Sequence, residues 1–195
     1  NFKETPHNLS KIYDDICQHK PDIVKIVTYA NDITDNIRIF ELLKSAKVPT
    51  ISFCMGELGY ISRILTSKFG GFLTFASLEK GKESAPGQLT EDELSNIYHF
   101  KEINRETTLY GIIGNPVSHS MSPAIHNAAF TEKGINNVYV PLKIAKIETF
   151  MKECRKIDFQ GFSVTIPHKE SVLPFLDDLD HTARKIGAIN TIVNL

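Results

Sequence analysis

The first residue that could do chemistry is a lysine inside an apolar, β-branched segment. Lys25 stands in residues 22–27, DIVKIV, between Val24 and Ile26. A charged amine in a buried strand loses its hydration, and burial lowers the pKa of an amine. A neutral amine is the form that attacks a carbonyl carbon to make a Schiff base. The alternative is a lysine whose stem lies on apolar surface while its amine reaches solvent.

A second set of polar residues follows another strand-like segment. Residues 114–123, GNPVSHSMSP, place Ser120 and Ser122 where a helix is predicted to begin. Hydroxyls and main-chain N–H groups at a helix start favour a carboxylate, because the helix dipole is positive there. The alternative is that Ser122 only caps the helix, with Pro123 at the first helical position.

Two more segments complete this set. Residues 161–169, GFSVTIPHK, end a predicted strand and place Lys169 just beyond its carboxyl end. Residues 187–191, GAINT, lead into a further strand. A lysine so placed could take the proton of a substrate hydroxyl. Taken alone, Lys169 would be interpreted as an exposed lysine at a helix start.

The first half of the chain carries four short motifs in one order, and together they resemble type I 3-dehydroquinate dehydratase, a (β/α)8 barrel. The motifs are NFKETP at 1–6, DIVKI at 22–26, MGELGYISR at 55–63 and SAPGQ at 84–88. The resemblance covers about residues 1–100 and corresponds to the C-terminal half of the barrel. It implies a Schiff base at Lys25 and a substrate carboxylate bound by Arg63, whose planar fork suits a carboxylate. It also implies that Ser84 and Gln88 hydrogen-bond the substrate from a closing loop; outside this context they would be ordinary turn residues.

The first half departs from that family in one respect. The family's catalytic histidine directly precedes the segment matching Asn1 and Phe2, and His7 does not match that position. Three predicted strands are also fewer than the eight that close a barrel. We therefore expect this chain by itself to lack dehydratase activity.

Residues 109–195 resemble the substrate domain of shikimate dehydrogenase, on the SHSMSP, GFSVTIPHK and GAINT segments. The resemblance implies that Ser120 and Ser122 bind the shikimate carboxylate and that Thr165 and Asn190 bind ring hydroxyls. Lys169 would be the acid/base. Ser163 stands where many single-function dehydrogenases carry asparagine, which leaves the choice between shikimate and quinate open.

The same resemblance implies NADP as the cofactor. No G-x-G-x-x-G motif occurs in the 195 residues, so we expect no cofactor-binding residue here and a nicotinamide domain beyond Leu195. Plant-type bifunctional dehydratase/dehydrogenases resemble the chain in the residues of the GFSVTIPHK segment and in the order of its two parts. Two alternatives stay open: a dehydrogenase fused to an inactive barrel remnant, and a carboxylate-binding protein without catalysis.

The elements that must position these residues alternate between strand-like and helix-like segments, which indicates α/β folds with parallel sheets. Strands are predicted at 22–27, 50–54, 72–75, 110–113, 138–140, 162–165 and 189–193. Helices are predicted at 8–19, 33–46, 59–65, 91–99, 122–133, 146–155 and 169–185, the last broken near Pro174. A polar linker at 101–108 divides a domain at 1–103 from one at 109–195.

Composition restricts the partners. The chain is 42% hydrophobic and 23% charged with a formal net charge of -1, which favours small-molecule substrates over nucleic acid or a membrane. The expected substrates are 3-dehydroquinate, 3-dehydroshikimate and shikimate. Three scattered cysteines, Cys17, Cys54 and Cys154, give neither a disulfide framework nor metal-ligand spacing. They indicate a reducing compartment such as the cytoplasm or the plastid stroma.

Overall fold

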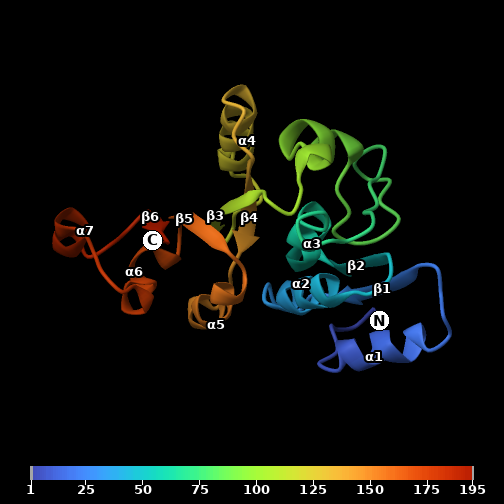
Figure 1. Ribbon diagram of the computed structural model, residues 1–195. Helices are drawn as coiled ribbons and strands as arrows, with labels where there is room; N and C mark the ends of the chain where they lie inside the picture. The colour runs from blue at the N-terminus through green and yellow to red at the C-terminus, as the bar shows by residue number, and fades with distance from the viewer. Residues whose placement is uncertain (1, 195) are drawn as a thin grey trace. The chain divides into compact units, whose positions relative to one another are not determined.

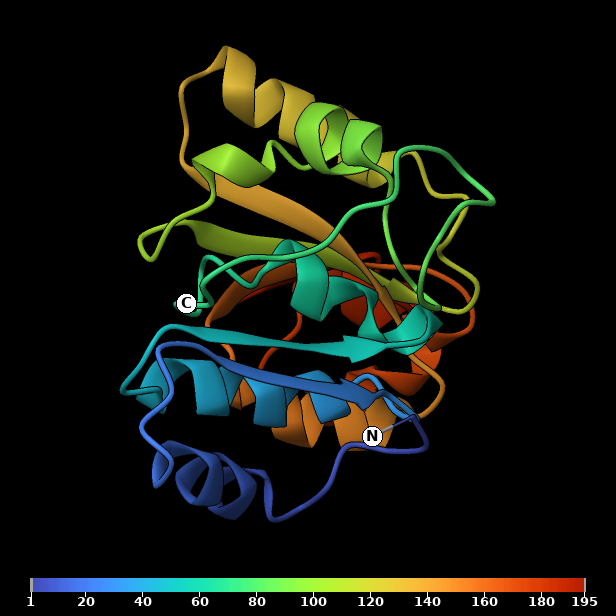
Figure 2. The same cartoon turned by 90° about the vertical axis from the view of Figure 1, so that its right-hand side faces the viewer.

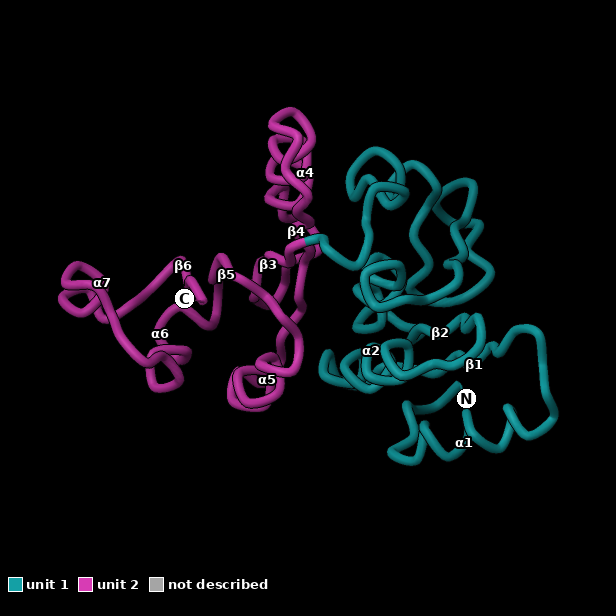
Figure 3. The backbone as a smooth tube through the Cα atoms, viewed as in Figure 1, with its two compact units in different colours: residues 1–107 teal, residues 108–195 magenta. Residues whose placement is uncertain are grey.

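The computed structural model describes residues 2–194 and divides into two compact units, residues 1–107 and 108–195 (Figure 3). Each unit builds its own sheet from βα connections (Figure 1). Within the described residues no helix has both the length and the apolar character needed to cross a membrane.

Unit 1 contains a two-stranded parallel sheet. Strand β1 (Val24–Tyr29) runs beside β2 (Thr50–Met55), with Val24 opposite Thr50 and Tyr29 opposite Met55. The helices of this unit are α1 (Leu9–Cys17), α2 (Asp35–Ser45) and α3 (Tyr60–Ile64), with a 3-10 turn η1 (Glu57–Gly59) before α3. Figures 1 and 2 show α1 and α2 on one face of the sheet and α3 on the other.

The predicted strand at 72–75 is wrong. The N–H of Phe72 donates to the carbonyl of Thr50 at 2.8 Å, but the ladder does not continue along β2. Farther on, Ser77 and Thr90 form one isolated bridge. Aromatic and β-branched residues favour a strand only where a partner edge accepts them. Here Phe72 and Phe75 stay exposed.

The predicted helix at 91–99 is shorter and irregular. A π-helical turn η2 (Glu93–Ile97) precedes the 3-10 turn η3 (Phe100–Glu102). η2 ends at Ile97, and His99, between the two turns, has a φ of 47° in the left-handed region, which a continuous helix cannot contain.

Unit 2 contains a four-stranded sheet in the order β4-β3-β5-β6. The strands are β3 (Thr108–Gly114), β4 (Asn137–Lys143), β5 (Phe159–Val164) and β6 (Thr191–Val193). β3 runs parallel to β4 and β5, whereas β6 is antiparallel to β5. The helices are α4 (Ser122–Glu132), α5 (Ile147–Glu153), α6 (His168–Ser171) and α7 (His181–Ile186), with 3-10 turns η4 (Cys154–Lys156) and η5 (Leu173–Phe175).

The predicted helix at 169–185 is wrong as a single element, because three short elements occupy the segment. Pro174 has no N–H to donate to a continuing helix. The carboxylate of Asp180 then starts α7, accepting from the N–H groups of Thr182 at 2.7 Å and Ala183 at 3.2 Å. Gly187, with a φ of 72°, ends α7 in the left-handed conformation.

Candidate functional site

Lys25 lies on β1 as predicted, but its side chain is exposed. Side chains alternate along β1, so Val24, Ile26 and Thr28 are buried on one face and Lys25 projects from the other. Its Nζ lies 4.4 Å from the ring centroid of Phe75. The expectation of a buried amine is therefore wrong for the described residues, because burial depends on what covers a strand as well as on the strand itself.

Arg63 on α3 is the buried cation of unit 1. It is 1% exposed, and its guanidinium lies 4.2 Å from the ring centroid of Phe53. Loss of hydration on burial lowers the pKa of Arg63 from 12.5 to about 10. Among the described residues, Nε and Nη2 have no hydrogen-bond partner. These two nitrogens form one edge of the guanidinium, the edge that binds a carboxylate through two parallel hydrogen bonds.

The two aromatic rings connect the two cations. Phe53 and Phe75 meet edge to face, with centroids 6.1 Å apart. Arg63 stacks on Phe53, and Lys25 lies over Phe75. The structure thus places the two predicted site residues along one apolar surface of unit 1.

The loop with Ser84 and Gln88 is anchored at the carboxyl end of β2. The N–H of Gly56 donates to the carbonyl of Pro86 at 3.0 Å. A Cβ on Gly87 would lie 2.1 Å from the carbonyl oxygen of Gly56, so only glycine permits this approach. Within the loop, the Oε1 of Gln88 accepts from the N–H of Ser84 at 2.8 Å and from its hydroxyl at 3.1 Å. The two predicted substrate ligands therefore bind each other here.

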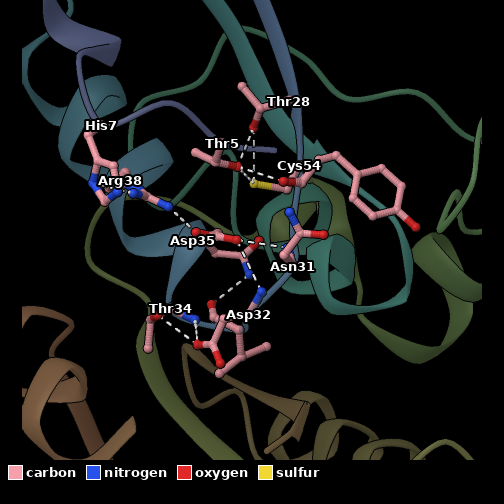
Figure 4. A network of polar contacts seen from close by, with 12 residues as sticks. Thr5, His7, Thr28, Asn31, Asp32, Thr34, Asp35, Arg38 and Cys54 are labelled. Atoms are coloured by element: carbon pink, nitrogen blue, oxygen red, sulfur yellow. Dashed lines mark hydrogen bonds and ion pairs between the residues drawn. The ribbon is translucent and has the colours of Figure 1, made fainter. Parts of the chain in front are cut away.

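A buried polar cluster missed by the sequence analysis ties the N-terminal segment to the sheet. The hydroxyls of Thr5 and Thr28 are 2.8 Å apart, and the Sγ of Cys54 lies 3.4 Å from Thr5 and 3.3 Å from Thr28 (Figure 4). Burial raises the pKa of the Cys54 thiol to about 11. The thiol therefore stays protonated at neutral pH and acts as a structural group.

Beside this cluster, Asp35 organises the turn into α2. Its carboxylate accepts from the N–H groups of Asn31 at 2.8 Å and Asp32 at 3.1 Å, and it forms an ion pair with Arg38 (Figure 4). Arg38 also contacts the Nδ1 of His7 at 2.9 Å. The Nδ1 of His7 thus belongs to a structural network.

In unit 2, main-chain hydrogen bonds join the three predicted motifs at the carboxyl ends of β3 and β5. The bonds run from Asn115 N to Ile166 O at 2.8 Å, Thr165 N to Ile113 O at 2.9 Å, Val164 N to Asn190 O at 2.7 Å and Ile189 N to Lys169 O at 2.9 Å. Segments far apart in sequence are thereby held at one end of the sheet, where α/β proteins bind their ligands.

The serine pair stands where β3 passes into α4. The prediction that Ser122 is the N-cap is wrong: Met121 occupies that position, and Ser122 is the first helical residue and makes no capping bond. Ser120 Oγ instead accepts from the N–H of Ser122 at 3.2 Å. The hydroxyl of Ser122 is therefore not used for capping.

Thr165 and Lys169 lie beyond the end of β5. A Cβ on Gly114 would lie 2.3 Å from the Cγ2 of Thr165, so this glycine admits the close approach of Thr165 to β3. Lys169 on α6 is exposed, and its amine has no hydrogen bond or ion pair among the described residues. Its neighbour His168, which the sequence analysis left unassigned, is buried and bonds through Nε2 to the carbonyl of Ile144 at 2.8 Å. That bond fixes the start of the helix that carries Lys169.

The described residues show no metal site, and the turn between β3 and α4 lacks the features of a dinucleotide site. No group of three or more His, Cys, Asp or Glu side chains is placed to hold a metal ion within residues 2–194. Between β3 and α4 the chain has no glycine after Gly114, whereas a pyrophosphate-binding turn needs three. The residues of this turn do not fit the pyrophosphate of NADP.

Comparison with protein families divides the chain in the same order. A family described as type I 3-dehydroquinase matches residues 1–105, and one described as shikimate dehydrogenase substrate binding domain matches residues 112–192. These matches confirm the two resemblances and the two α/β fold types predicted from the sequence.

Individual relatives follow the same division. The chain is 49% identical over 195 residues to a chloroplastic bifunctional 3-dehydroquinate dehydratase/shikimate dehydrogenase of Arabidopsis thaliana, covering 99% of this chain and 32% of that protein. It is 50% identical over 94 residues to a shikimate dehydrogenase (NADP(+)) of Pyrococcus furiosus, covering 48% and 35%. It is 35% identical over 184 residues to the pentafunctional AROM polypeptide of Schizosaccharomyces pombe, covering 88% and 11%. The chain thus spans about a third or less of the length of these relatives.

Proposed function

Because the chain belongs to the type I 3-dehydroquinase family and continues into a shikimate dehydrogenase substrate binding domain, we propose that it serves two steps of the shikimate pathway. The steps are dehydration of 3-dehydroquinate and NADP-dependent interconversion of 3-dehydroshikimate and shikimate, on the way to aromatic amino acids. The observation that carries the proposal is the match to the Arabidopsis bifunctional enzyme over 99% of this chain. The name of that relative also supports a plastid location.

In the dehydration, the Lys25 amine attacks the substrate ketone and releases water to form an iminium ion. The positive nitrogen withdraws electrons, so a base can take the proton of the adjacent C–H to give an enamine. The C–O bond at the next carbon then breaks, and the same proton, returned by the base, makes the leaving hydroxide water. Hydrolysis of the iminium then returns the free amine. Arg63 would hold the substrate carboxylate on its Nε–Nη2 edge, which satisfies the two donors that lack partners in the described chain. Ser84 and Gln88 would exchange their mutual hydrogen bonds for bonds to the substrate.

In the second reaction, the carboxylate of shikimate would lie at Ser120 and Ser122, with its ring hydroxyls at Thr165 and Asn190. The exposed amine of Lys169 would accept the proton of the reacting hydroxyl during oxidation and return it during reduction. NADP supplies or accepts the hydride when bound. Since the turn between β3 and α4 does not fit the pyrophosphate of the dinucleotide, its binding site would lie elsewhere in the complete polypeptide.

The test is to trap the imine. The complete polypeptide is incubated with 3-dehydroquinate, reduced with borohydride and digested for mass spectrometry. The adduct is expected on Lys25, and Lys25→Arg should abolish dehydration while shikimate oxidation continues. An adduct on Lys68 or Lys80 instead would contradict the assignment. Dehydration by the Lys25→Arg variant would exclude the Schiff-base route.

A further inference from the structure

Tyr139 on β4 has a buried hydroxyl that the proposed chemistry does not use. Tyr139 lies opposite Tyr110 on β3, and the next residue on the same face of β3, Ile112, lies opposite Ser163 on β5. Since side chains alternate along a strand, these four residues share one face of the sheet. A tyrosine ring that leans across Ile112 from β4 therefore brings its hydroxyl toward β5.

Two sets of contacts hold Tyr139 in place: hydrogen bonds to its main chain and stacking on its ring. The Asn127 side chain on α4 bonds both main-chain groups of Tyr139, donating to its carbonyl at 2.9 Å and accepting from its N–H at 2.7 Å. The His126 ring stacks on the Tyr139 ring with centroids 4.3 Å apart and planes 14° apart. The residue is 4% exposed. The hydroxyl therefore cannot leave its place to find solvent.

The hydroxyl nevertheless lacks a partner. Tyr139 Oη makes no hydrogen bond within the described residues. Burial raises the pKa of Tyr139, whereas the hydroxyl and the main chain of Ser163 and the hydroxyl of Ser122 lower it. These groups lie close to the phenol oxygen, although none of them makes a hydrogen bond of normal geometry with it. The phenol consequently keeps its proton at neutral pH and is available as a donor. A buried donor without an acceptor costs free energy, which a small movement of either serine would recover.

We propose that Tyr139 is a positioning residue of the carboxylate site, donating its hydroxyl proton to Ser122 Oγ so that the Ser122 hydroxyl points its own proton at a bound carboxylate. Ser163, on the other side of the phenol, donates to Tyr139 Oη and completes a chain of three hydroxyls. Each hydrogen bond in such a chain polarises the next one, so the last donor is strengthened toward an anion. The inference rests on the proposed function, since it assumes that Ser122 binds the carboxylate of shikimate.

The test compares Tyr139→Phe with Tyr110→Phe in the complete polypeptide. Both changes remove one phenol oxygen from the same face of the sheet, but Tyr110 is only partly buried and packs on Phe130. The dissociation constant for shikimate is measured by calorimetry, and the thermal midpoint is measured without ligand. Tyr139→Phe should weaken binding about threefold to tenfold, the usual range for one hydrogen bond. Its midpoint should stay the same or rise, because the change removes an unpartnered buried donor. Tyr110→Phe should leave binding unchanged.

A double-variant cycle identifies the route of the effect. In a Ser122→Ala background, Tyr139→Phe should have no further effect on binding, because the hydroxyl it positions is gone. Unchanged shikimate binding in Tyr139→Phe would overturn the proposal. A lower thermal midpoint, together with the same loss of binding in the unaltered and the Ser122→Ala backgrounds, would overturn it as well. If the unaltered polypeptide fails to bind shikimate, the proposed function itself fails. That outcome is distinct from one in which only the effect of Tyr139 is missing.

Discussion

Replacing Arg63 by methionine should stabilise the ligand-free protein while it removes the carboxylate site. Burial lowers the pKa of Arg63 from 12.5 to about 10, and each pKa unit corresponds to about 1.4 kcal/mol. The charged form is therefore disfavoured by about 3 kcal/mol. Stacking of the guanidinium on Phe53 offsets about 1–2 kcal/mol of this cost. Methionine keeps an apolar side chain against Phe53 without the charge, so the free energy of unfolding should rise by about 1–2 kcal/mol.

Arg38→Met is the matched control, because the same substitution should have the opposite effect there. Arg38 is paired with the carboxylate of Asp35, so its removal leaves a mostly buried negative charge without its cation. Urea unfolding followed by circular dichroism at pH 7–8 measures both variants. The Arg63 penalty is fully present below its folded pKa of about 10 and is relieved only above it, so the comparison is insensitive to pH in that range.

Two results would contradict the assignment of Arg63 as an unpaired carboxylate ligand. If Arg63→Met lowers the free energy of unfolding as Arg38→Met does, the Arg63 guanidinium must have an anionic partner in the ligand-free protein. Its free edge could then not be the carboxylate site. A stabilised Arg63→Met variant that still dehydrates 3-dehydroquinate with an unchanged KM would likewise separate Arg63 from the substrate.

Three further predictions concern other groups. In the complete polypeptide, Lys169→Ala should lower kcat for shikimate by about 10²–10⁴-fold, as expected for loss of a general acid/base. Ser120→Ala should mainly raise KM. Steady-state kinetics measures both, and an unchanged kcat in Lys169→Ala would contradict the prediction. Asp180→Ala should destabilise α7 at pH 7, because the Asp180 carboxylate accepts from the N–H groups of Ala183 and Thr182, which lower its pKa below 3.8. In thermal melts at acid pH the variant and the unaltered protein should have the same midpoint, because protonation removes that acceptor. Iodoacetamide at pH 8 should label Cys17 before Cys54, because burial raises the pKa of Cys54 to about 11. If mass spectrometry showed Cys54 labelled first, the thiol could not lie in the buried cluster with Thr5 and Thr28.

The sequence predicted elements well where a single local signal was sufficient. The β-branched segments at 22–27 and 50–54 became β1 and β2 with small shifts at their ends. The prediction of a strand at 72–75 failed because a strand needs pairing that continues along its partner, and the bond of Phe72 to Thr50 is not followed by a ladder along β2. The helix at 169–185 was divided because Pro174 and the Asp180 cap act at single residues inside an otherwise helical pattern.

The candidate sites were predictable as motifs but not as environments. The spacing of a strand places Lys25 on one face, yet only the structure shows that this face leaves the amine exposed. The pattern Ser-Pro favours a cap at Ser122, whereas the turn places Met121 there and leaves the Ser122 hydroxyl to other uses. Tyr139 gave no sequence signal, because a tyrosine in an apolar strand is an ordinary core residue until its hydroxyl is found without a partner.

Two buried donors bear on the choice between the proposed function, an inactive barrel remnant and a carboxylate-binding protein without catalysis. Nε and Nη2 of Arg63 in unit 1 and Oη of Tyr139 in unit 2 lack hydrogen-bond partners among the described residues, and each residue lies at or beside a predicted carboxylate site. A protein selected only for stability gains by replacing such groups with apolar ones, since an unsatisfied buried donor destabilises the fold. A substrate carboxylate would accept directly from Arg63, whereas Tyr139 would donate to Ser122 Oγ, whose own proton then points at the carboxylate. Functional sites commonly show this exchange of ligand-free stability for binding. Substitutions that stabilise the empty protein and weaken carboxylate binding together would therefore disfavour an inactive barrel remnant, whereas turnover of substrate by the complete polypeptide is what separates catalysis from binding alone.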